Sequence, residues 1–405
     1  MTNRERFKAI ARFQRPGDLW ITDSFWQETL ISWVENGGPP QLTNSAYRGQ
    51  YFGFDHSRET KEIISGLIQV PYVAGEIESY LAIPPIVPTF EPKVVEEDEK
   101  TLIILNQGGQ TVKVLKDHPQ KMPMYLDQPV KDRETWKEYK KRLDPHTPER
   151  WPDDWEGYVE KMNSRDFPVI LGVGSFFGFL REWMGLENLL YTFHDDPKLI
   201  EEMIDTLLEL ELEVIKRTVK DIKVDQASFW EDMCYKTGPL ISPAMFRKFM
   251  MPRYRRITDL LHKNGIDIIF VDSDGNVNKL IPLWLECGIN YIWPLEVAAG
   301  NDAVALRKEY GQDLILGGNI DKRALIKDKG AIKEEVMSKV PFLLEKGGYF
   351  PTVDHLVPPD VTLDNYQYYI NTVREVAGLD EIPYSPSGNQ LKRVLRDEYE
   401  KSGGE

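Results

Sequence analysis

The strongest constraint on the fold is a regular alternation of short apolar runs and helical stretches after Phe167. The apolar runs begin near residues 167, 224, 267, 290, 313 and 348. Alternating strands and helices are typical of a parallel sheet, because each crossover returns the chain to the same end of the sheet. The pattern therefore predicts an α/β fold with at least these six parallel strands.

The clearest helix is predicted from Pro197 to about Val219, where apolar residues recur at helical spacing between acids and lysines. Pro197 suits the first turn of a helix, because a first-turn residue needs no backbone N–H donor. A second long helix is expected to begin after Ser242-Pro243 and to run to His262.

Two further runs, at 19–23 and 67–73, would raise the strand number to eight, which closes a (β/α)8 TIM barrel. The alternative is an open doubly wound sheet. That alternative lacks its usual glycine motif, because Gly172-x-Gly174 is followed by Ser175 and two phenylalanines. We therefore predict a single TIM-barrel domain over residues 1–405.

Residues 88–165 are predicted to be an insertion into this barrel. Two β-prone runs, 101–105 and 111–115, flank a turn containing Gly108-Gly109, which favours a β-hairpin. Polar helices are expected near 130–143 and 152–163. The insertion should therefore be a β-hairpin with a helical return.

Composition excludes several classes of protein. A net charge of −15 disfavours binding to nucleic acid, because phosphate backbones would be repelled. Two cysteines, Cys234 and Cys287, are too few for a disulfide scaffold and fit a reducing compartment. The sequence has no apolar run long enough for a membrane span and no visible targeting segment, so we expect a cytoplasmic protein.

Polar side chains follow five successive predicted strands. In a TIM barrel the carboxyl ends of the strands converge on the face that carries the active site. These residues are Glu231 and Asp232, Asp272 and Asp274, Trp293 and Glu296, Asn319 and Asp321, and Asp354 and His355.

Some of these residues have an ordinary structural explanation, because acids at strand ends often cap the next helix. We expect Asp321 and Asp360 to begin helices, and Asp274 or Asn276 could do the same. The pairs Glu231-Asp232 and Asp354-His355 have no evident capping task. Adjacent acids in an apolar setting should raise at least one pKa, which suits proton transfer.

Several segments of this chain, all outside residues 88–165, resemble those of the uroporphyrinogen decarboxylase superfamily. They are Arg4–Ile10 with Arg15–Asp18, Trp230–Met233, Ile241–Pro243, Gly318–Asp321, and Gly347–Tyr349 through Pro358-Pro359. The resemblance implies a TIM barrel with its site at the carboxyl ends of the strands. It also implies one of two chemistries, which are tetrapyrrole decarboxylation and corrinoid-dependent methyl transfer.

The sequence departs from both branches at informative positions. The haem-pathway decarboxylases have arginines where this chain reads Ile21–Trp26, so that activity is disfavoured. The thiol-methylating members bind zinc through His-x-Cys and a later Cys. Here Asp272-x-Asp274 replaces the first motif, and Asp354 or His355 replaces the later cysteine. Asp272, Asp274 and His355 could still bind Zn²⁺ through oxygen and nitrogen.

The resulting hypothesis is a methyltransferase that moves a methyl group from a small methylated compound to a corrinoid carrier protein. An aryl methyl ether is the favoured donor, zinc or a carboxylic acid assists the leaving oxygen, and a homodimer is possible. Glu231, Asp232 and His355 are the predicted catalytic residues. Phe176, Phe177, Trp230, Trp293 and Asn319 are predicted to bind substrate.

Two alternatives remain open. One is a cofactor-independent decarboxylase of a small acid, with Asp272 and His355 handling protons. The other is a non-catalytic binding barrel. The insertion at 88–165 could serve as the docking element for the corrinoid carrier.

Overall fold

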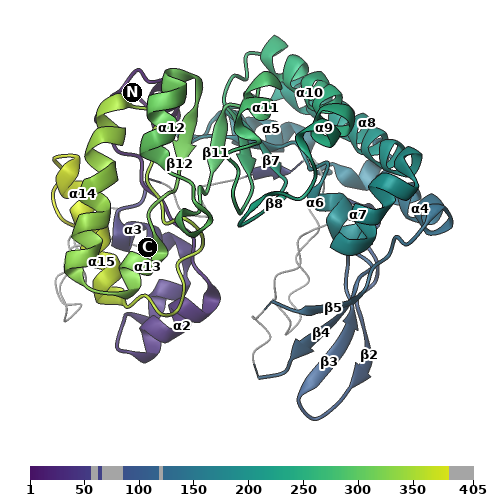
Figure 1. Cartoon of the computed structure of the whole chain (residues 1–405), viewed down its shortest axis with the longest axis horizontal. Coiled ribbons are helices and arrows are strands. Elements are labelled where there is room, and N and C mark those ends of the chain that lie inside the picture. The colour runs from purple at the N-terminus through teal and green to yellow at the C-terminus, as the bar shows by residue number, and fades with distance from the viewer. Residues whose placement is uncertain (56–62, 66–84, 118–121, 383–405) are drawn as a thin grey trace. The chain divides into compact units, whose positions relative to one another are not determined.

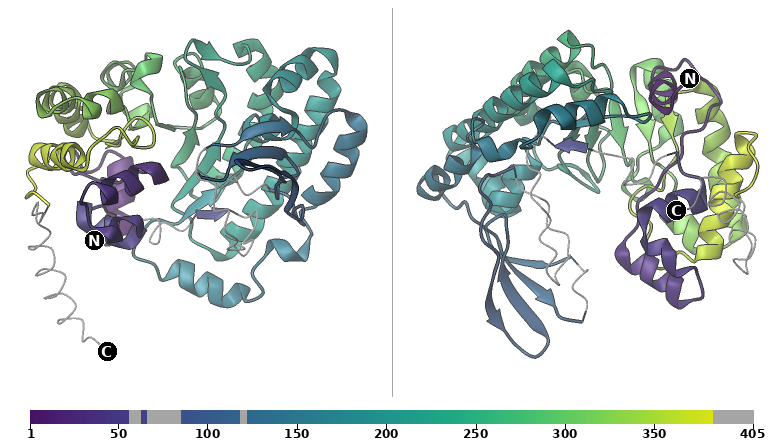
Figure 2. Two further views of the ribbon diagram at one scale, coloured as in Figure 1. Left: turned by 90° about the horizontal axis from the view of Figure 1, so that it is seen from below. Right: turned by 180° about the vertical axis from the view of Figure 1, so that it is seen from behind.

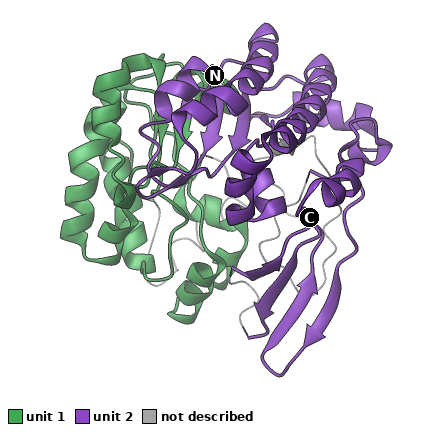
Figure 3. Cartoon of the chain, turned by 45° about the vertical axis from the view of Figure 1, so that its right-hand side comes forward, with its two compact units in different colours: residues 1–62, 292–405 green, residues 63–291 purple. Residues whose placement is uncertain are grey.

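The computed structural model describes residues 1–55, 63–65, 85–117 and 122–382, which belong to two compact units (Figure 3). Unit 1 comprises residues 1–62 and 292–405, and unit 2 comprises residues 63–291. Strand β11 (Tyr291–Trp293) spans the boundary between these two ranges. The predicted run at 67–73 lies outside the described residues.

Unit 2 contains parallel strands in the order β1-β6-β7-β10, of which β7 is labelled in Figure 1. Their bounds are β1 (Ile63–Ser65), β6 (Ile170–Gly172), β7 (Gln226–Trp230) and β10 (Ile269–Asp272). Gly172 aligns with Ser228, and Trp230 aligns with Asp272. This register brings the residues after β7 and β10 to neighbouring strand ends.

The helices of unit 2 follow the predicted pattern. Helix α8 (Pro197–Asp221) has Pro197 in its first turn and is capped by the Asp196 side chain, which accepts from Leu199 N. Ser242 caps the predicted second helix, which passes through a π-helical turn at Phe246–Met250. The other helical elements are α4 (Arg133–Tyr139), η2 (Lys140–Leu143), η3 (Pro148–Arg150), α5 (Trp155–Asn163), α6 (Gly178–Met184), α7 (Leu186–Asp195), α9 (Pro243–Met245), α10 (Met251–Lys263) and α11 (Ile281–Glu286).

The predicted hairpin forms with the expected bounds, as β3 (Thr101–Leu105) and β4 (Thr111–Leu115). It is the centre of a four-stranded antiparallel sheet completed by β2 (Lys93–Glu97) and β5 (Met124–Asp127). Ile104, Val112 and Val114 form its buried cluster. Viewed from behind, this sheet extends away from the helices of unit 2 (Figure 2). Its turn at residues 106–110 contacts them, because the Tyr139 hydroxyl of α4 donates to the Gly108 carbonyl and Gln110 Nε2 donates to the Glu182 carbonyl of α6. A short second hairpin, β8 (Cys234–Tyr235) and β9 (Gly238–Pro239), follows β7.

Unit 1 pairs β12 (Ile315–Gly317) with β13 (Tyr349–Phe350) in parallel. Helices α14 (Lys329–Lys346) and α15 (Leu363–Val376) pack against one another. The other helical elements are α1 (Asn3–Ala11), α2 (Gln27–Glu35), η1 (Pro40–Thr43), α3 (Ser45–Phe52), η5 (Val297–Ala299), α12 (Ala303–Tyr310), η6 (Gly311–Asp313) and α13 (Lys322–Ile326).

The expected strand at 19–23 does not form. Leu19, Trp20 and Ile21 are buried, as an apolar run should be. Both backbone hydrogen bonds of Ile21 are made with Asp55. Ile21 N donates to Asp55 Oδ2 at 2.6 Å, and Asp55 N donates to the Ile21 carbonyl at 2.9 Å. This run is therefore buried and β-prone, but it forms no strand because it does not pair with a neighbouring strand.

The predicted α/β class is confirmed, since all six strands expected after Phe167 form and those with an assigned register pair in parallel. Among the described residues, no helix combines the length and apolar character needed to cross a membrane.

Candidate functional site

Glu231, directly after β7, is an anchor for the first turn of α6. Its side chain is fully buried, and its carboxylate accepts five hydrogen bonds of 2.5–3.3 Å. The donors are the backbone amides of Phe176, Phe177 and Gly178 and the hydroxyls of Ser175 and Tyr254. Burial raises the pKa of Glu231, as expected for one acid of this pair, while these hydrogen bonds oppose the rise.

Asp232 lies next to Glu231 but remains partly exposed, and it occupies the left-handed region with φ 45°. Arg181 of α6 holds it twice, because Nη2 pairs with Oδ2 at 2.7 Å and Nη1 donates to the Asp232 carbonyl at 2.7 Å. The Arg181 guanidinium also lies 5.6 Å from the centre of the Trp230 ring, within cation–π range. Arg181 was missed at the sequence level, because nothing in its local pattern distinguishes it from a surface arginine.

The loop after β10 is bonded to the loop after β7. The Asp272 carbonyl accepts from the amides of Glu231 at 2.8 Å and Asp232 at 3.3 Å. Asp274 N donates to Asp232 Oδ1 at 3.3 Å. Unit 2 therefore places Asp232, Asp272 and Asp274 in loops at neighbouring strand ends, and their predicted roles stay predictions.

Gly275 makes this close approach of the two loops possible. Its φ is +81°, and a Cβ atom there would lie 2.6 Å from the carbonyl oxygen of Cys234. Because the obstructing atom belongs to the backbone of the β8–β9 hairpin, only glycine fits without moving that hairpin.

The predicted aromatic residues have different surroundings. Phe176 and Phe177 are buried, with ring centres 5.1 Å from Tyr254 and 6.5 Å from Phe193, respectively. Trp230 is partly exposed and lies against Gly178 at the start of α6. Among these three aromatic residues, Trp230 therefore presents part of its side chain to solvent, while Phe176 and Phe177 pack in the core.

Asp354 and His355, after β13, belong to unit 1. Asp354 is fully buried and accepts from the amides of Val297 at 2.8 Å and Lys322 at 3.1 Å. Burial raises the pKa of Asp354, while Lys322 opposes the rise. The prediction that Asp354 has no capping role is therefore wrong, because its carboxylate accepts from the first backbone amides of η5 and α13.

His355 is partly exposed and stacks on Trp26, with ring centres 5.9 Å apart and an interplanar angle of 29°. Trp293 donates from Nε1 to Thr352 Oγ1 at 2.8 Å. His355 and Trp293 thus have described partners within unit 1, and their predicted roles stay predictions.

Asn319, a predicted substrate-binding residue, is fully buried in the left-handed region with φ 66°. Its amide nitrogen donates to the carbonyls of Leu295 at 2.7 Å and Asn301 at 3.0 Å, and its oxygen accepts from Ala303 N at 3.0 Å. These three bonds join the residues before α12 to the end of β12. They account for an asparagine here without a ligand.

The capping predictions have mixed outcomes. Asp321 caps α13 as predicted, by accepting from Arg323 N at 2.9 Å. The prediction for Asp360 is wrong, because Thr362 caps α15 instead. Asn276 accepts from Asn278 N at 3.3 Å, and no side chain caps α11.

The predicted zinc ligands are divided between the units, with Asp272 and Asp274 in unit 2 and His355 in unit 1. Among the residues that the structure describes, no three His, Cys, Asp or Glu side chains form a group that could hold a metal ion. The zinc site therefore stays a prediction, and no step below depends on a metal.

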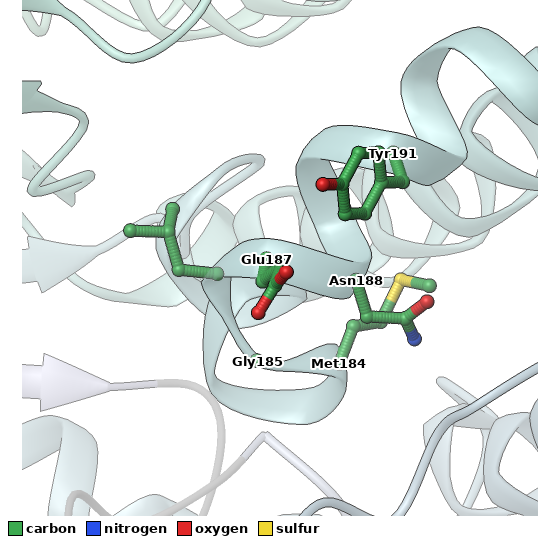
Figure 4. Close-up of a pocket in the computed structure, with 6 residues that line it drawn as sticks. Met184, Gly185, Glu187, Asn188 and Tyr191 are labelled. Carbon is green, nitrogen blue, oxygen red and sulfur yellow. The ribbon is translucent and has the colours of Figure 1, made fainter.

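A hollow of about 460 Å³ lies at the turn between α6 and α7 (Figure 4). Its lining residues are Met184, Gly185, Leu186, Glu187, Asn188 and Tyr191. None of the predicted site residues is among them, so this hollow is separate from the strand-end chemistry.

Comparison with known proteins adds independent findings. Residues 101–376, more than half of the chain, match the family described as Uroporphyrinogen decarboxylase (URO-D). The uroporphyrinogen decarboxylase of Legionella pneumophila (strain Corby) is 25% identical over 223 residues, and that of strain Paris is 24% identical. These matches cover 54% of this chain and 54% of each relative, so the chain spans about half the length of the curated relatives it matches.

Among solved structures, a methyltransferase from Methanosarcina mazei aligns with a TM-score of 0.55 at 13% identity. The alignment covers 93% of this chain and 99% of that chain. At this level of identity the similarity shows a shared fold.

Proposed function

Because this chain belongs to the uroporphyrinogen decarboxylase family, we propose that it is an enzyme of the methyl-transferring kind within that family. The proposed reaction moves a methyl group from a small methylated compound, best an aryl methyl ether, to a corrinoid carrier protein. The shared fold with a methyltransferase supports this branch of the family.

The observation that carries the proposal is the chemistry of residues 21–26 in unit 1. The resemblance places substrate-binding arginines at this stretch in haem-pathway decarboxylases. Here the stretch contains no arginine, and its ionisable residue is Asp23, which accepts hydrogen bonds from Val353 N and the Tyr366 hydroxyl. A polycarboxylate substrate would therefore lack the arginines that bind its carboxylates, which favours a substrate without several carboxylates.

From the exposure of the strand-end residues we infer different parts for them in the proposed reaction. When the methyl–oxygen bond breaks, the leaving oxygen needs a proton, and positioned acids typically contribute about 10²–10⁴-fold to such a step. Asp232 and His355 keep partly exposed side chains and are the candidates for handling this proton. Glu231 fixes α6 through its five bonds, and Trp230 offers an aromatic face for a ring.

The test uses purified protein, a reduced corrinoid carrier and a panel of methoxylated aromatic compounds. We expect formation of the demethylated phenol together with one methylated carrier per phenol, measured by chromatography and by the visible absorbance of the corrinoid. The variant His355→Ala should lose most of this activity, whereas Glu35→Gln, an exposed change on α2, should retain it. Absence of phenol with every donor would contradict the proposal.

The decarboxylase alternative is favoured by the similarity to the uroporphyrinogen decarboxylases of Legionella pneumophila. In that case Asp272 and His355 would handle the proton that replaces CO₂ on a small acid. Release of CO₂ from a carboxylated substrate without any corrinoid, lost in Asp272→Asn, would establish this alternative instead.

A further inference from the structure

The position of His355 depends on a neighbouring segment near the N-terminus. Within unit 1, Val357 N donates to the Ser24 carbonyl at 2.9 Å, and Trp26 N donates to the Val357 carbonyl at 3.3 Å. The Trp26 ring stacks on the His355 ring. Residues 24–26 and 355–357 are therefore held side by side.

Asp23, next to residues 24–26, binds the backbone on the N-terminal side of residues 355–357. Val353 N donates to Asp23 Oδ1 at 3.0 Å, and the Tyr366 hydroxyl donates to Asp23 Oδ2 at 2.9 Å. Tyr366 belongs to α15 and is fully buried. Asp23 thus connects a buried helix to the backbone two residues before His355.

The surroundings of Asp23 favour its neutral form. Burial raises the pKa of Asp23 to about 8, and Asp354 adds to the rise, while the hydrogen bonds from Tyr366, Val353 N and Ser24 N oppose it. Asp23 also interacts electrostatically with the buried Tyr369 hydroxyl. The Arg48 guanidinium interacts in the same way with the Tyr366 hydroxyl. A neutral acid can still accept from Val353 on Oδ1 and exchange one hydrogen bond with Tyr366 through Oδ2.

We propose that Asp23 is a positioning residue for His355, which holds Val353 N–H and the Tyr366 hydroxyl and thereby fixes the strand end that presents the imidazole. The inference rests on the proposed function only in giving His355 a part in the reaction. The geometric claim, that Asp23 sets the environment of His355, is independent of methyl transfer.

The matched variants are Asp23→Asn and Asp23→Ala. Asparagine reproduces the neutral acid, because its oxygen can accept from Val353 N and its amide can donate to Tyr366. Alanine removes both bonds. Tyr366→Phe removes one bond and keeps the buried ring, and Glu35→Gln is an exposed control on α2 in the same unit.

The first measurement is histidine NMR of the full chain, which has six histidines, with the His355 signal identified by its loss in His355→Ala. We expect Asp23→Asn and Glu35→Gln to keep the His355 chemical shift. Asp23→Ala should shift and broaden the signal, and Tyr366→Phe should shift it less in the same direction. An unchanged His355 signal in Asp23→Ala overturns the inference; if that variant does not fold, an unchanged signal in Tyr366→Phe overturns it.

The second measurement is kcat/KM for methyl transfer across pH 6–9. Asp23→Ala should lose about 10- to 100-fold, the range typical when a residue that orients a functional histidine is removed. Asp23→Asn should retain most of the activity at pH 7. If Asp23→Asn resembles Asp23→Ala in both measurements, the two hydrogen bonds of Asp23 do not position His355. Inactive wild-type protein with a normal NMR response would count against the proposed function and leave the positioning role standing.

Discussion

Glu231 and Asp232 are adjacent in the chain, yet their carboxylates have different surroundings. Glu231 is buried and accepts five hydrogen bonds from α6 and α10 and the loop before α6. Asp232 is partly exposed and paired with Arg181. The difference arises because the backbone turns sharply at Asp232, whose φ is 45°. One acid is therefore fully engaged in the fold, and the other keeps a partly exposed side chain.

The first prediction concerns Glu231→Gln. A glutamine must turn an –NH₂ group toward some of the donors that now face carboxylate oxygens. Each buried group left without a partner costs about 1–3 kcal/mol. We expect the free energy of unfolding, measured with urea, to fall by at least this amount.

Asp232→Asn is the control for Glu231→Gln, because exposed ion pairs are typically worth less than about 1 kcal/mol. Equal stability of the two variants would contradict the anchoring role of Glu231.

The second prediction is a pH dependence from Glu211 on α8, whose carboxylate oxygens are buried without a protein hydrogen-bond partner among the described residues. Burial raises the pKa of Glu211 to about 8, while Arg150 opposes the rise. The folded state therefore binds this proton more tightly than the unfolded state. The associated stability is fully present below the unfolded pKa of about 4.3 and is lost as the pH rises through about 8.

The variant Glu211→Gln cannot ionise and should lack this dependence. We expect the unfolding free energy of the wild type minus that of Glu211→Gln to fall steadily from pH 5 to pH 8 and then to level off. A difference that stays constant from pH 5 to pH 9 would show that Glu211 does not titrate in this way.

At the level of elements, the close contact between the end of β6 and helix α8 depends on Gly174. Its φ is +79°, and a Cβ atom there would lie 2.3 Å from Glu211 Oε1. Gly174 immediately precedes the residues that donate to Glu231. Close packing therefore joins three segments here, which are the end of β6, the start of α6 and the middle of α8.

The third prediction is that Gly174→Ala and Glu211→Ala are coupled. Gly174→Ala should destabilise through both the left-handed backbone, at about 1–2 kcal/mol, and the collision with Glu211. The double variant should be more stable than the sum of the single effects, by roughly 0.5–3 kcal/mol. Urea unfolding of the four proteins measures this difference.

Gly311→Ala provides the matched control for the Gly174 prediction. Its φ is +55°, but a Cβ atom there would meet nothing within 4 Å. It should show the backbone penalty alone and no coupling to Glu211→Ala. Strict additivity for Gly174 and Glu211 would contradict the described contact.

At the level of the whole molecule, the fourth prediction concerns the zinc set proposed from the sequence. That hypothesis predicts about one zinc in a metal analysis of the purified chain, because two carboxylates and an imidazole suit this ion. Asp272→Ala and His355→Ala should each lose it, whereas the exposed control Asp360→Asn should not. Unchanged metal content in the first two variants would remove the proposed ligands.

Local chemistry explains which elements could be predicted from the sequence. The β3–β4 hairpin has its predicted bounds because a glycine-containing turn between two β-prone runs is sufficient to specify it. Pro197 and Ser242 likewise mark helix starts through their own backbone preferences. The run at 19–23 failed as a strand because pairing depends on a partner strand, which an apolar run does not supply.

The sequence by itself determined the α/β alternation, the helix starts and the placement of acids after successive strands, because each depends on neighbours within a few residues. Tertiary structure alone decided which acids are buried. Glu231 receives its donors from residues 23–56 positions away, and Asp23 receives two of its donors, Val353 N and the Tyr366 hydroxyl, from more than 300 positions away. Hydrogen bonds over such separations form only when the fold brings the groups together, so no local pattern can reveal them.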